Sequence, residues 1–248
     1  MIPATAGEIL TENRLRAFVR CSEFYHLGGN LEESSLQEVV RSVYENTLAS
    51  IIRRPDLDPL HVMNKAAYRL IKATGMQDTH MQSQVTEFHR HTLLIANEIF
   101  TTLPLAHYTP VFGPFTYITR VSKTPIELRI SGLLRSKKNK ALHVVSFSPY
   151  REQHSVNNDP ITQLKLTTLK HAVPPHNNRK ADCRMHSFGT YNTGTLFYRF
   201  TDTSHRNPEI LKQITTMVRI MEQGFRYPIT PCPHNCKFKE ICQIGEKK

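Results

Sequence analysis

Three cysteines lie close together near the end of the chain, and this spacing constrains the fold more than any other feature. Cys232, Cys236 and Cys242 share one short polar segment in a chain of 248 residues with five cysteines. Neighbouring thiolates can reach one metal ion or cluster, since local ligands lower the loop-closure cost of assembling a site. Ordinary buried thiols are the alternative, which the prolines and charged residues around these three disfavour. A fourth ligand would come from Cys21, Cys183, His234 or another histidine.

The chemistry of the site stays open between two metals, because zinc and a 4Fe-4S cluster both accept four thiolates. Metal binding is favoured over disulfides if the compartment is reducing. No apolar run reaches the roughly 18 residues of a membrane span, and Met1 to Leu10 lack the basic start and apolar stretch of a signal peptide. We therefore expect a cytoplasmic protein with no membrane partner.

The charge of the chain favours a polyanionic partner. There are 32 Lys and Arg residues against 21 Asp and Glu residues, which gives a formal net charge of +11. Each phosphate contact made by a cationic side chain releases condensed counterions, so a basic chain gains affinity for nucleic acid. A basic protein without such a partner is the alternative. We expect the partner to be a nucleic acid.

The first hundred residues have the apolar spacing of helices. Thr11 can cap the first helix, and Ser35 opens a second one that Pro55 ends. Two further helices are predicted over about 62–75 and 79–102. The middle of the chain is rich in β-branched and aromatic residues instead, which predicts strands. The predicted strands are Phe112 to Val121, Ile126 to Leu134, Leu142 to Phe147, Arg184 to Thr190 and Thr195 to Phe200. The remaining predicted helices are Pro160 to His171 and Pro208 to Gln223, the latter closed by Gly224.

This order of elements, with a mostly antiparallel meander at its centre, is typical of an α+β or a mixed α/β fold, and we expect the mixed α/β fold. No segment has the composition of a linker, so we expect a single domain over residues 1–248. Within it we expect a helical part at 1–105, a sheet core at 106–206, and a C-terminal helix with the cysteine tail at 207–248.

Both ends of the chain resemble RecB-like nucleases of the AddB-type and CRISPR-associated groups. Residues Leu10 to Tyr25, LTENRLRAFVRCSEFY, resemble the capped helix, cysteine and aromatic pair that open those proteins. Residues 224–228, GFRYP, followed by the three tail cysteines, resemble their end, although the family more often has two residues between the first two tail cysteines and here there are three. The resemblance implies a 4Fe-4S cluster that joins the ends of the chain, with Cys183 left out and zinc as the alternative. Its ligands would be Cys21, Cys232, Cys236 and Cys242.

The resemblance also implies the PD-(D/E)XK restriction-endonuclease-like core, in which acidic residues on adjacent strands hold Mg²⁺ and a lysine steadies the attacking water. In this chain Arg135 stands where the first acid is expected. Ser146 and Ser148 stand where the second acid and the lysine are expected, while Gln163 resembles the family's helix glutamine. Because hydroxyls and a guanidinium cannot hold Mg²⁺ as carboxylates do, we expect no enzymatic activity.

Basic residues around the vacated site are the expected contacts to phosphate, with Arg135 in the site itself and the Lys137–Lys140 turn beside it. A solvated lysine-rich turn is the alternative for the turn. The expected DNA-binding residues are Arg135, Lys137, Lys138, Lys140, Lys165, Lys170, Arg179 and Lys180.

These features together predict a catalytically inactive DNA-binding protein that prefers single-stranded DNA. It would recruit a protein partner, such as a polymerase, helicase or nuclease, in replication, recombination or transcription. An active metal-dependent exonuclease with displaced acids, such as Glu127 or Glu152, is one alternative. A structural subunit of a larger assembly is the other.

Overall fold

The structure is a computed structural model of the chain, and it describes residues 9–20, 35–73, 82–147, 160–172, 183–190, 196–202 and 208–224. Its helices in these ranges are α1 (Glu12–Arg20), α3 (Ser35–Arg53), α4 (Pro59–Ala73), α5 (Gln82–Thr102), α6 (Pro160–Ala172) and α7 (Pro208–Glu222). Its strands there are β1 (Leu10–Thr11), β2 (Tyr108–Phe112), β3 (Phe115–Val121), β4 (Thr124–Ile130), β5 (Gly132–Ser136), β6 (Leu142–Phe147), β7 (Cys183–Thr190) and β8 (Leu196–Asp202).

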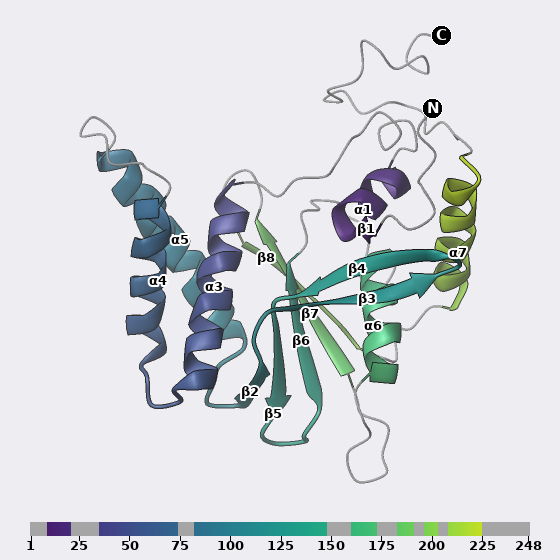
Figure 1. Cartoon of the computed structure of the whole chain (residues 1–248). Helices are drawn as coiled ribbons and strands as arrows, with labels where there is room; N and C mark the ends of the chain where they lie inside the picture. Colours follow the sequence, from purple (N-terminus) through teal and green to yellow (C-terminus); the bar gives the residue numbers. More distant parts are fainter. Residues whose placement is uncertain are drawn as a thin grey trace.

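The strands form two sheets (Figure 1). The larger sheet has the order β2-β5-β6-β7-β8, and β6 and β7 run parallel while the other neighbours are antiparallel. The smaller sheet has the order β1-β4-β3, with β1 parallel to β4. A parallel pair needs a crossover connection, and α6 lies in the connection between β6 and β7. The chain is therefore a mixed α/β protein, as predicted, although with more parallel pairing than a meander has.

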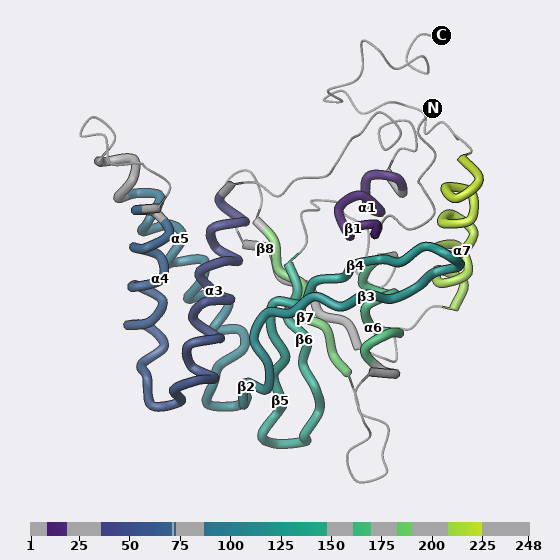
Figure 2. Tube along the Cα trace, viewed as in Figure 1, coloured from purple at the N-terminus to yellow at the C-terminus, as the bar shows by residue number. Residues whose placement is uncertain are grey.

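Helices cover both faces of the larger sheet (Figures 1 and 2). On one face Tyr44 of α3 and Ile99 of α5 pack in one cluster with Phe188 of β7. On the other face Leu166 of α6 packs in a cluster with Val144 of β6. The apolar residues of these clusters are almost fully buried, so burial on the two faces holds the sheet between its helices.

The smaller sheet packs against the two ends of the described chain. Leu15 and Phe18 of α1 share a core cluster with Ile126 and Leu128 of β4 and with α7. The α7 residues buried there are Ile210, Ile214, Val218 and Met221, which follow the spacing of one helix face. At its end α7 is held to the β3–β4 turn, because the Glu222 carboxylate accepts hydrogen bonds from all three residues around that turn, Ser122 Oγ, Lys123 N and Thr124 Oγ1, at 2.7–2.9 Å.

The helix ends predicted from local signals agree with the structure. The backbone N–H of Arg14 donates to Thr11 Oγ1 over 3.3 Å, which confirms the predicted cap. Helix α3 begins at Ser35 and ends two residues before Pro55. Gly224 follows α7 with a φ of 70°, in the left-handed region that glycine tolerates best.

Two of the predicted strands are each divided in the structure. The segment expected as Phe112 to Val121 has its first residue in β2 and the rest in β3, with Gly113 and Pro114 between the two strands. The segment expected as Ile126 to Leu134 breaks at Ser131, where the chain passes from the smaller sheet to the larger one.

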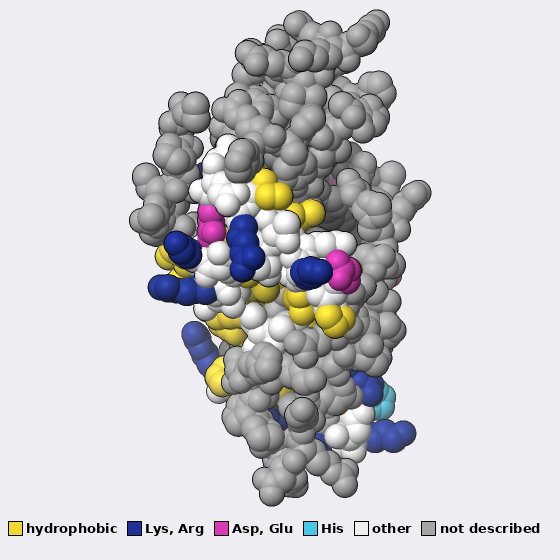
Figure 3. Space-filling view, turned by 90° about the vertical axis from the view of Figure 1, so that its right-hand side faces the viewer, with side chains coloured by type: hydrophobic (Ala, Val, Ile, Leu, Met, Phe, Trp, Pro, Cys, Tyr) yellow, Lys and Arg dark blue, Asp and Glu magenta, His cyan; other side chains and the backbone are white. Residues whose placement is uncertain are grey.

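The face that carries α7 has no concentrated basic patch among its described residues. Figure 3 shows that the described Lys and Arg side chains on this face are spread among neutral and acidic ones. Within the described ranges no helix combines the length and the apolar character needed to cross a membrane.

Candidate functional site

The β5–β6 hairpin sets the geometry of the predicted site. Its antiparallel register pairs Gly132 with Val145 and Arg135 with Leu142. Ser131, just before Gly132, donates its backbone N–H to the carbonyl of Val145 over 2.8 Å. Ser131 therefore lies at the same end of the hairpin as Ser146, the residue after Val145.

This register corrects the position predicted for Arg135. The side chain is half-buried near the turn end of β5, four residues along the strand from Ser131. At about 3.4 Å per residue, that places Arg135 roughly 14 Å from the level of Ser146. The basic turn beyond Arg135 is farther still, so neither lies beside Ser146 as expected. Ser131, and not Arg135, is the strand neighbour of Ser146.

A buried ion pair occupies the Ser146 end of the hairpin. The ammonium of Lys165, on α6, donates to Ser146 Oγ over 2.8 Å and contacts both carboxylate oxygens of Glu12 at 2.8 Å. The Lys165 side chain is 2% exposed and that of Glu12 is 11% exposed. Glu12 also accepts a hydrogen bond from Arg16 at 3.4 Å and from the backbone N–H of Arg129 at 3.3 Å. The pair thus joins α1, β4, β6 and α6.

A second carboxylate lies at the same end of the hairpin. Glu45 of α3 is 5% exposed, and its Oε1 accepts a hydrogen bond from Ser131 Oγ over 2.7 Å. The guanidinium of Arg129 contacts both Glu45 oxygens, and Arg41 lies 3.7 Å from Oε2. Arg129 thereby joins the Glu45 pair to the Glu12 pair through its side chain and its backbone. We call Glu12, Glu45, Arg129, Ser131, Ser146 and Lys165 the polar cluster.

The sequence interpretation missed the two acids of this cluster. Glu45 sits between Tyr44 and Leu48, inside the apolar stripe of α3, and a charge in a buried stripe is a signal of a pairing partner. Glu12 carries no comparable signal, since an acid in the first turn of a helix is ordinary. The acid that the interpretation did weigh, Glu127, lies opposite Ile118 on the smaller sheet, outside the polar cluster. Glu152 lies outside the described residues.

The predicted DNA contacts have different positions. Lys137, Lys138 and Lys140 are exposed at the β5–β6 turn, although the Lys137 ammonium donates to the carbonyl of Leu105 over 2.9 Å. Lys165 is withdrawn from the expected interface, because its ammonium is buried in the polar cluster. Lys170 lies on α6, where only its backbone is described. Arg179 and Lys180 lie outside the described residues.

All four predicted cluster ligands lie outside the described residues. Cys21, Cys232, Cys236 and Cys242 lie in segments that the structure does not describe, and so does Ser148. Cys183 is 1% exposed in the core beside α6. Across the described part of the chain, no group of three or more His, Cys, Asp and Glu side chains is placed to hold a metal ion.

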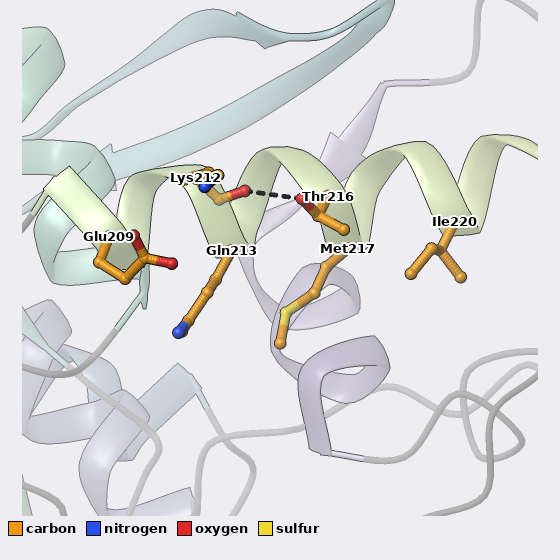
Figure 4. A pocket seen from close by; sticks show the side chains of 6 residues that line it. All are labelled: Glu209, Lys212, Gln213, Thr216, Met217 and Ile220. Atoms are coloured by element: carbon orange, nitrogen blue, oxygen red, sulfur yellow. Dashed lines mark hydrogen bonds between the residues drawn. The ribbon is translucent and has the colours of Figure 1, made fainter.

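Two hollows lie away from the polar cluster. One, of ≈ 320 Å³, runs along α7, and Figure 4 shows Glu209, Gln213, Met217 and Ile220 pointing to the same side of the helix while Thr216 donates back to the carbonyl of Lys212 over 3.0 Å. The other, of ≈ 400 Å³, lies between the start of α4 and the end of α5. Neither contains a cluster of titratable groups, so neither has the chemistry of an active site.

Comparisons with known proteins assign the chain to no family. No family model matches the chain, and no curated protein matches it. Among solved structures, the crystal structure of SSO0001 is similar over 93% of this chain and 94% of that chain, at 10% sequence identity and a TM-score of 0.34. The chain is a mixed α/β protein whose polar cluster joins α1, α3 and α6 to the strands.

Proposed function

We propose that the chain is a DNA-binding protein built on a PD-(D/E)XK-like core that does not cut DNA. The observation that carries this proposal is the ammonium of Lys165, held between Glu12 and Ser146. Mg²⁺ needs a near-octahedral set of oxygens and is usually anchored by carboxylates. Here the strand positions offer the hydroxyls of Ser131 and Ser146, and a lysine ammonium already supplies the positive charge beside Glu12. We therefore propose that this site does not support metal-dependent hydrolysis.

The order of elements supports this core. The antiparallel hairpin β5–β6, the crossover helix α6 and the parallel strand β7 follow one another along the chain, and α3 precedes them with α4, α5 and β2–β4 between. The polar cluster lies at one end of that hairpin, and Gln163 is fully buried on the crossover helix. The resemblance to RecB-like nucleases implies metal-binding acids at this position in the layout.

We propose that a 4Fe-4S cluster on Cys21, Cys232, Cys236 and Cys242 joins the ends of the chain. The packing of the flanking helices supports it, because α1, which ends one residue before Cys21, shares a core with α7, after which the cysteine tail follows. Bound iron and sulfide would contribute ligation energy that stabilises this junction. Protein purified without air should be brown, with a broad band near about 400 nm. The Cys21→Ala variant should lose iron, while Cys183→Ala, the matched control, should keep it. If the purified protein instead contains one zinc ion per chain, the four cysteines would bind zinc and not an iron–sulfur cluster.

The proposed DNA contacts are the exposed lysines of the β5–β6 turn, with Arg135 beside them. The net charge of +11 and the exposure of Lys137, Lys138 and Lys140 support this assignment. Phosphate contacts of this kind fix a protein on nucleic acid without reading its sequence. We propose single-stranded DNA as the preferred form, with a polymerase, helicase or nuclease as the recruited partner.

One assay tests the central claim. Labelled single- and double-stranded DNA is incubated with the protein and Mg²⁺ or Mn²⁺, and both retention and cleavage are measured. We expect retention that falls with salt, and no cleavage. Cleavage that is abolished by Glu12→Gln or Glu45→Gln would instead establish an active exonuclease with displaced acids. The presence of these two acids at the same end of the hairpin favours this second function. If the protein retains no DNA, the remaining proposal would be a structural role in a larger assembly.

A further inference from the structure

An apolar groove lies between the start of α4 and the end of α5. It has a volume of ≈ 400 Å³, within the range of roughly 300–1,000 Å³ typical of ligand sites. Pro59, Leu60, Met63, Asn97, Phe100, Thr101, Pro104 and Leu105 line it. Most of these side chains are apolar, so the groove suits apolar groups better than phosphate.

Packing and a helix cap hold the walls of this groove in place. Met63 is 3% exposed in the core that joins α4 to α5, and the Phe100 ring packs against Tyr44 with centroids 5.0 Å apart. Asp58 caps α4, accepting hydrogen bonds from the backbone N–H groups of Leu60 and His61 at 3.2 Å. A preformed wall lowers the conformational entropy lost on binding, so an occupant could be held without rearrangement of the helices.

One apolar side chain of these walls is left half in water. Leu60 is 51% exposed although its backbone is fixed by the Asp58 cap. An occupant of the groove would bury the remaining surface of Leu60 and gain the hydrophobic free energy that folding has not used. At the facing wall, Thr101 Oγ1 donates to the carbonyl of Asn97, and these two are the polar residues of the lining.

The charge beside the groove indicates the kind of occupant. The Lys137 ammonium donates to the carbonyl of Leu105, a residue of the groove wall, so the basic turn adjoins the groove. Lys138 and Lys140 are exposed on the same turn. Of the nearby acids, Asp58 caps α4 and Asp56 pairs with Arg54, while Glu98 is exposed on α5, the helix that leads to Leu105. Cations at one end of an apolar groove suit a segment whose apolar residues are followed by acidic ones.

We propose that this groove binds a short segment of a partner protein, with two bulky apolar side chains in the groove and acidic residues on the basic turn. The proposal goes beyond the DNA contacts, because the groove itself is apolar and only the turn is shared. An acidic segment on the turn would compete with DNA for the same lysines, which would couple partner binding to DNA release.

A synthetic probe tests the groove directly. The probe is a fluorescein-labelled peptide of about a dozen residues, with a leucine and a phenylalanine followed by glutamates, and its binding is followed by fluorescence anisotropy. We expect affinity in the micromolar range that weakens with salt, and at least about tenfold weaker binding of a scrambled peptide. Equal binding of the scrambled peptide, or no binding of the ordered one, would overturn the proposal.

Variants separate this groove from the DNA surface. Leu60→Glu and Thr101→Glu, both at exposed positions, should each weaken peptide binding by at least about tenfold without changing the melting curve. Tyr68→Glu, on α4 but outside the groove, is the matched control and should bind the peptide as the wild type does. Leu60→Glu should leave DNA affinity unchanged. Equal weakening of peptide and DNA binding in Leu60→Glu would assign the groove to nucleic acid, and unchanged peptide affinity would exclude the groove.

Discussion

Lys165 donates to Ser146 across 2.8 Å from a helix on one face of the sheet, and its ammonium is shared with Glu12. The lysine, the hydroxyl and the carboxylate come from α6, β6 and α1, so three separate parts of the chain meet at one buried charge. A buried ion pair of this kind is a poor source of net stability, because desolvation of both ions offsets their attraction. Loss of only one partner, however, leaves the other charge buried with less compensation, although Arg16 still contacts Glu12 at 3.4 Å.

The first prediction follows from that asymmetry. Lys165→Met should lower the free energy of unfolding by about 3 kcal/mol, because Glu12 loses its ammonium while it stays buried. Adding Glu12→Gln should recover part of the loss, with a coupling energy of about 1–3 kcal/mol in urea denaturation. Lys212→Met, at an exposed site, is the control and should change stability by less than about 0.5 kcal/mol. Strictly additive losses from Lys165→Met and Glu12→Gln would contradict the coupling.

The second prediction concerns the basic turn. Changing Lys137, Lys138 and Lys140 together to alanine should weaken DNA binding about equally for all sequences. The slope of log affinity against log salt should shrink by about 0.7 for each phosphate of single-stranded DNA that the variant no longer neutralises. A control with the same reduction in charge changes the exposed Lys65, Lys72 and Lys212. Equal weakening by both triple variants would mean that overall charge, and not this turn, sets the affinity.

The third prediction concerns Gly132, where the hairpin meets α3. A Cβ built at Gly132 would overlap Cδ2 of the fully buried Leu48. Gly132→Ala should therefore cost about 1–3 kcal/mol in unfolding free energy, through overpacking of a dense core. At Gly113 an added Cβ would lie 3.5 Å from the Cβ of Ala49, at an ordinary van der Waals distance. Gly113→Ala is the control, and a destabilisation as large as that of Gly132→Ala would remove the steric explanation.

Local chemistry made parts of this fold predictable. A cap at Thr11, a helix start at Ser35 and a stop at Gly224 each depend on a few neighbouring residues, and the structure has all three. The mixed α/β class followed from the change from helical spacing to β-branched segments. The division at Ser131 was missed although Ser131 and Gly132 are residue types common in turns, because the division is a change of sheet that depends on tertiary packing.

The site was less predictable, because it depends on register and on distant partners. Motif spacing matched Arg135 to a metal position, but antiparallel pairing puts Ser131 at that end of the hairpin. Lys165 was interpreted as a DNA contact on a helix, and only the packing of α6 against α1 and β6 reveals its buried role. The four-cysteine site remains a prediction, since its ligands lie outside the described residues.

The fourth prediction uses the backbone of the basic turn. Lys140 has a φ of 62°, in the left-handed region that costs a side chain free energy. Its N–H donates to the carbonyl of Ser136 over 3.0 Å, so the turn depends on this conformation. Lys140→Gly should stabilise the protein by about 0.5–1 kcal/mol in thermal or urea unfolding. Lys138→Gly, at a neighbouring turn residue without a positive φ, should give no gain, and a gain there would show that strain at Lys140 is not the cause.

The last prediction concerns a buried pair of histidines between β6 and β7. Nδ1 of His143 lies 2.7 Å from Nε2 of His186, and the rings are stacked with centroids 4.9 Å apart. Each residue is 3% exposed. One nitrogen must donate and the other accept, so the hydrogen bond needs at least one neutral ring. Burial, with the neighbouring His143 and Arg184, lowers the pKa of His186 to about 3.

The sign of the pH effect follows from this lowered pKa. In the unfolded chain His186 takes up a proton below about pH 6.5, whereas in the folded protein it stays neutral until about pH 3. Its contribution to stability is therefore complete above pH 6.5 and is lost as the pH falls through that window. The free energy of unfolding falls by up to about 1.4 kcal/mol per pH unit in this window. The total loss from His186 is about 2 kcal/mol by pH 5. Denaturation at pH 7, 6 and 5 should show a smaller loss for His186→Gln than for the wild type. The exposed His61→Gln should lose as much as the wild type, and a matching pH dependence in all three proteins would exclude the buried pair as its source.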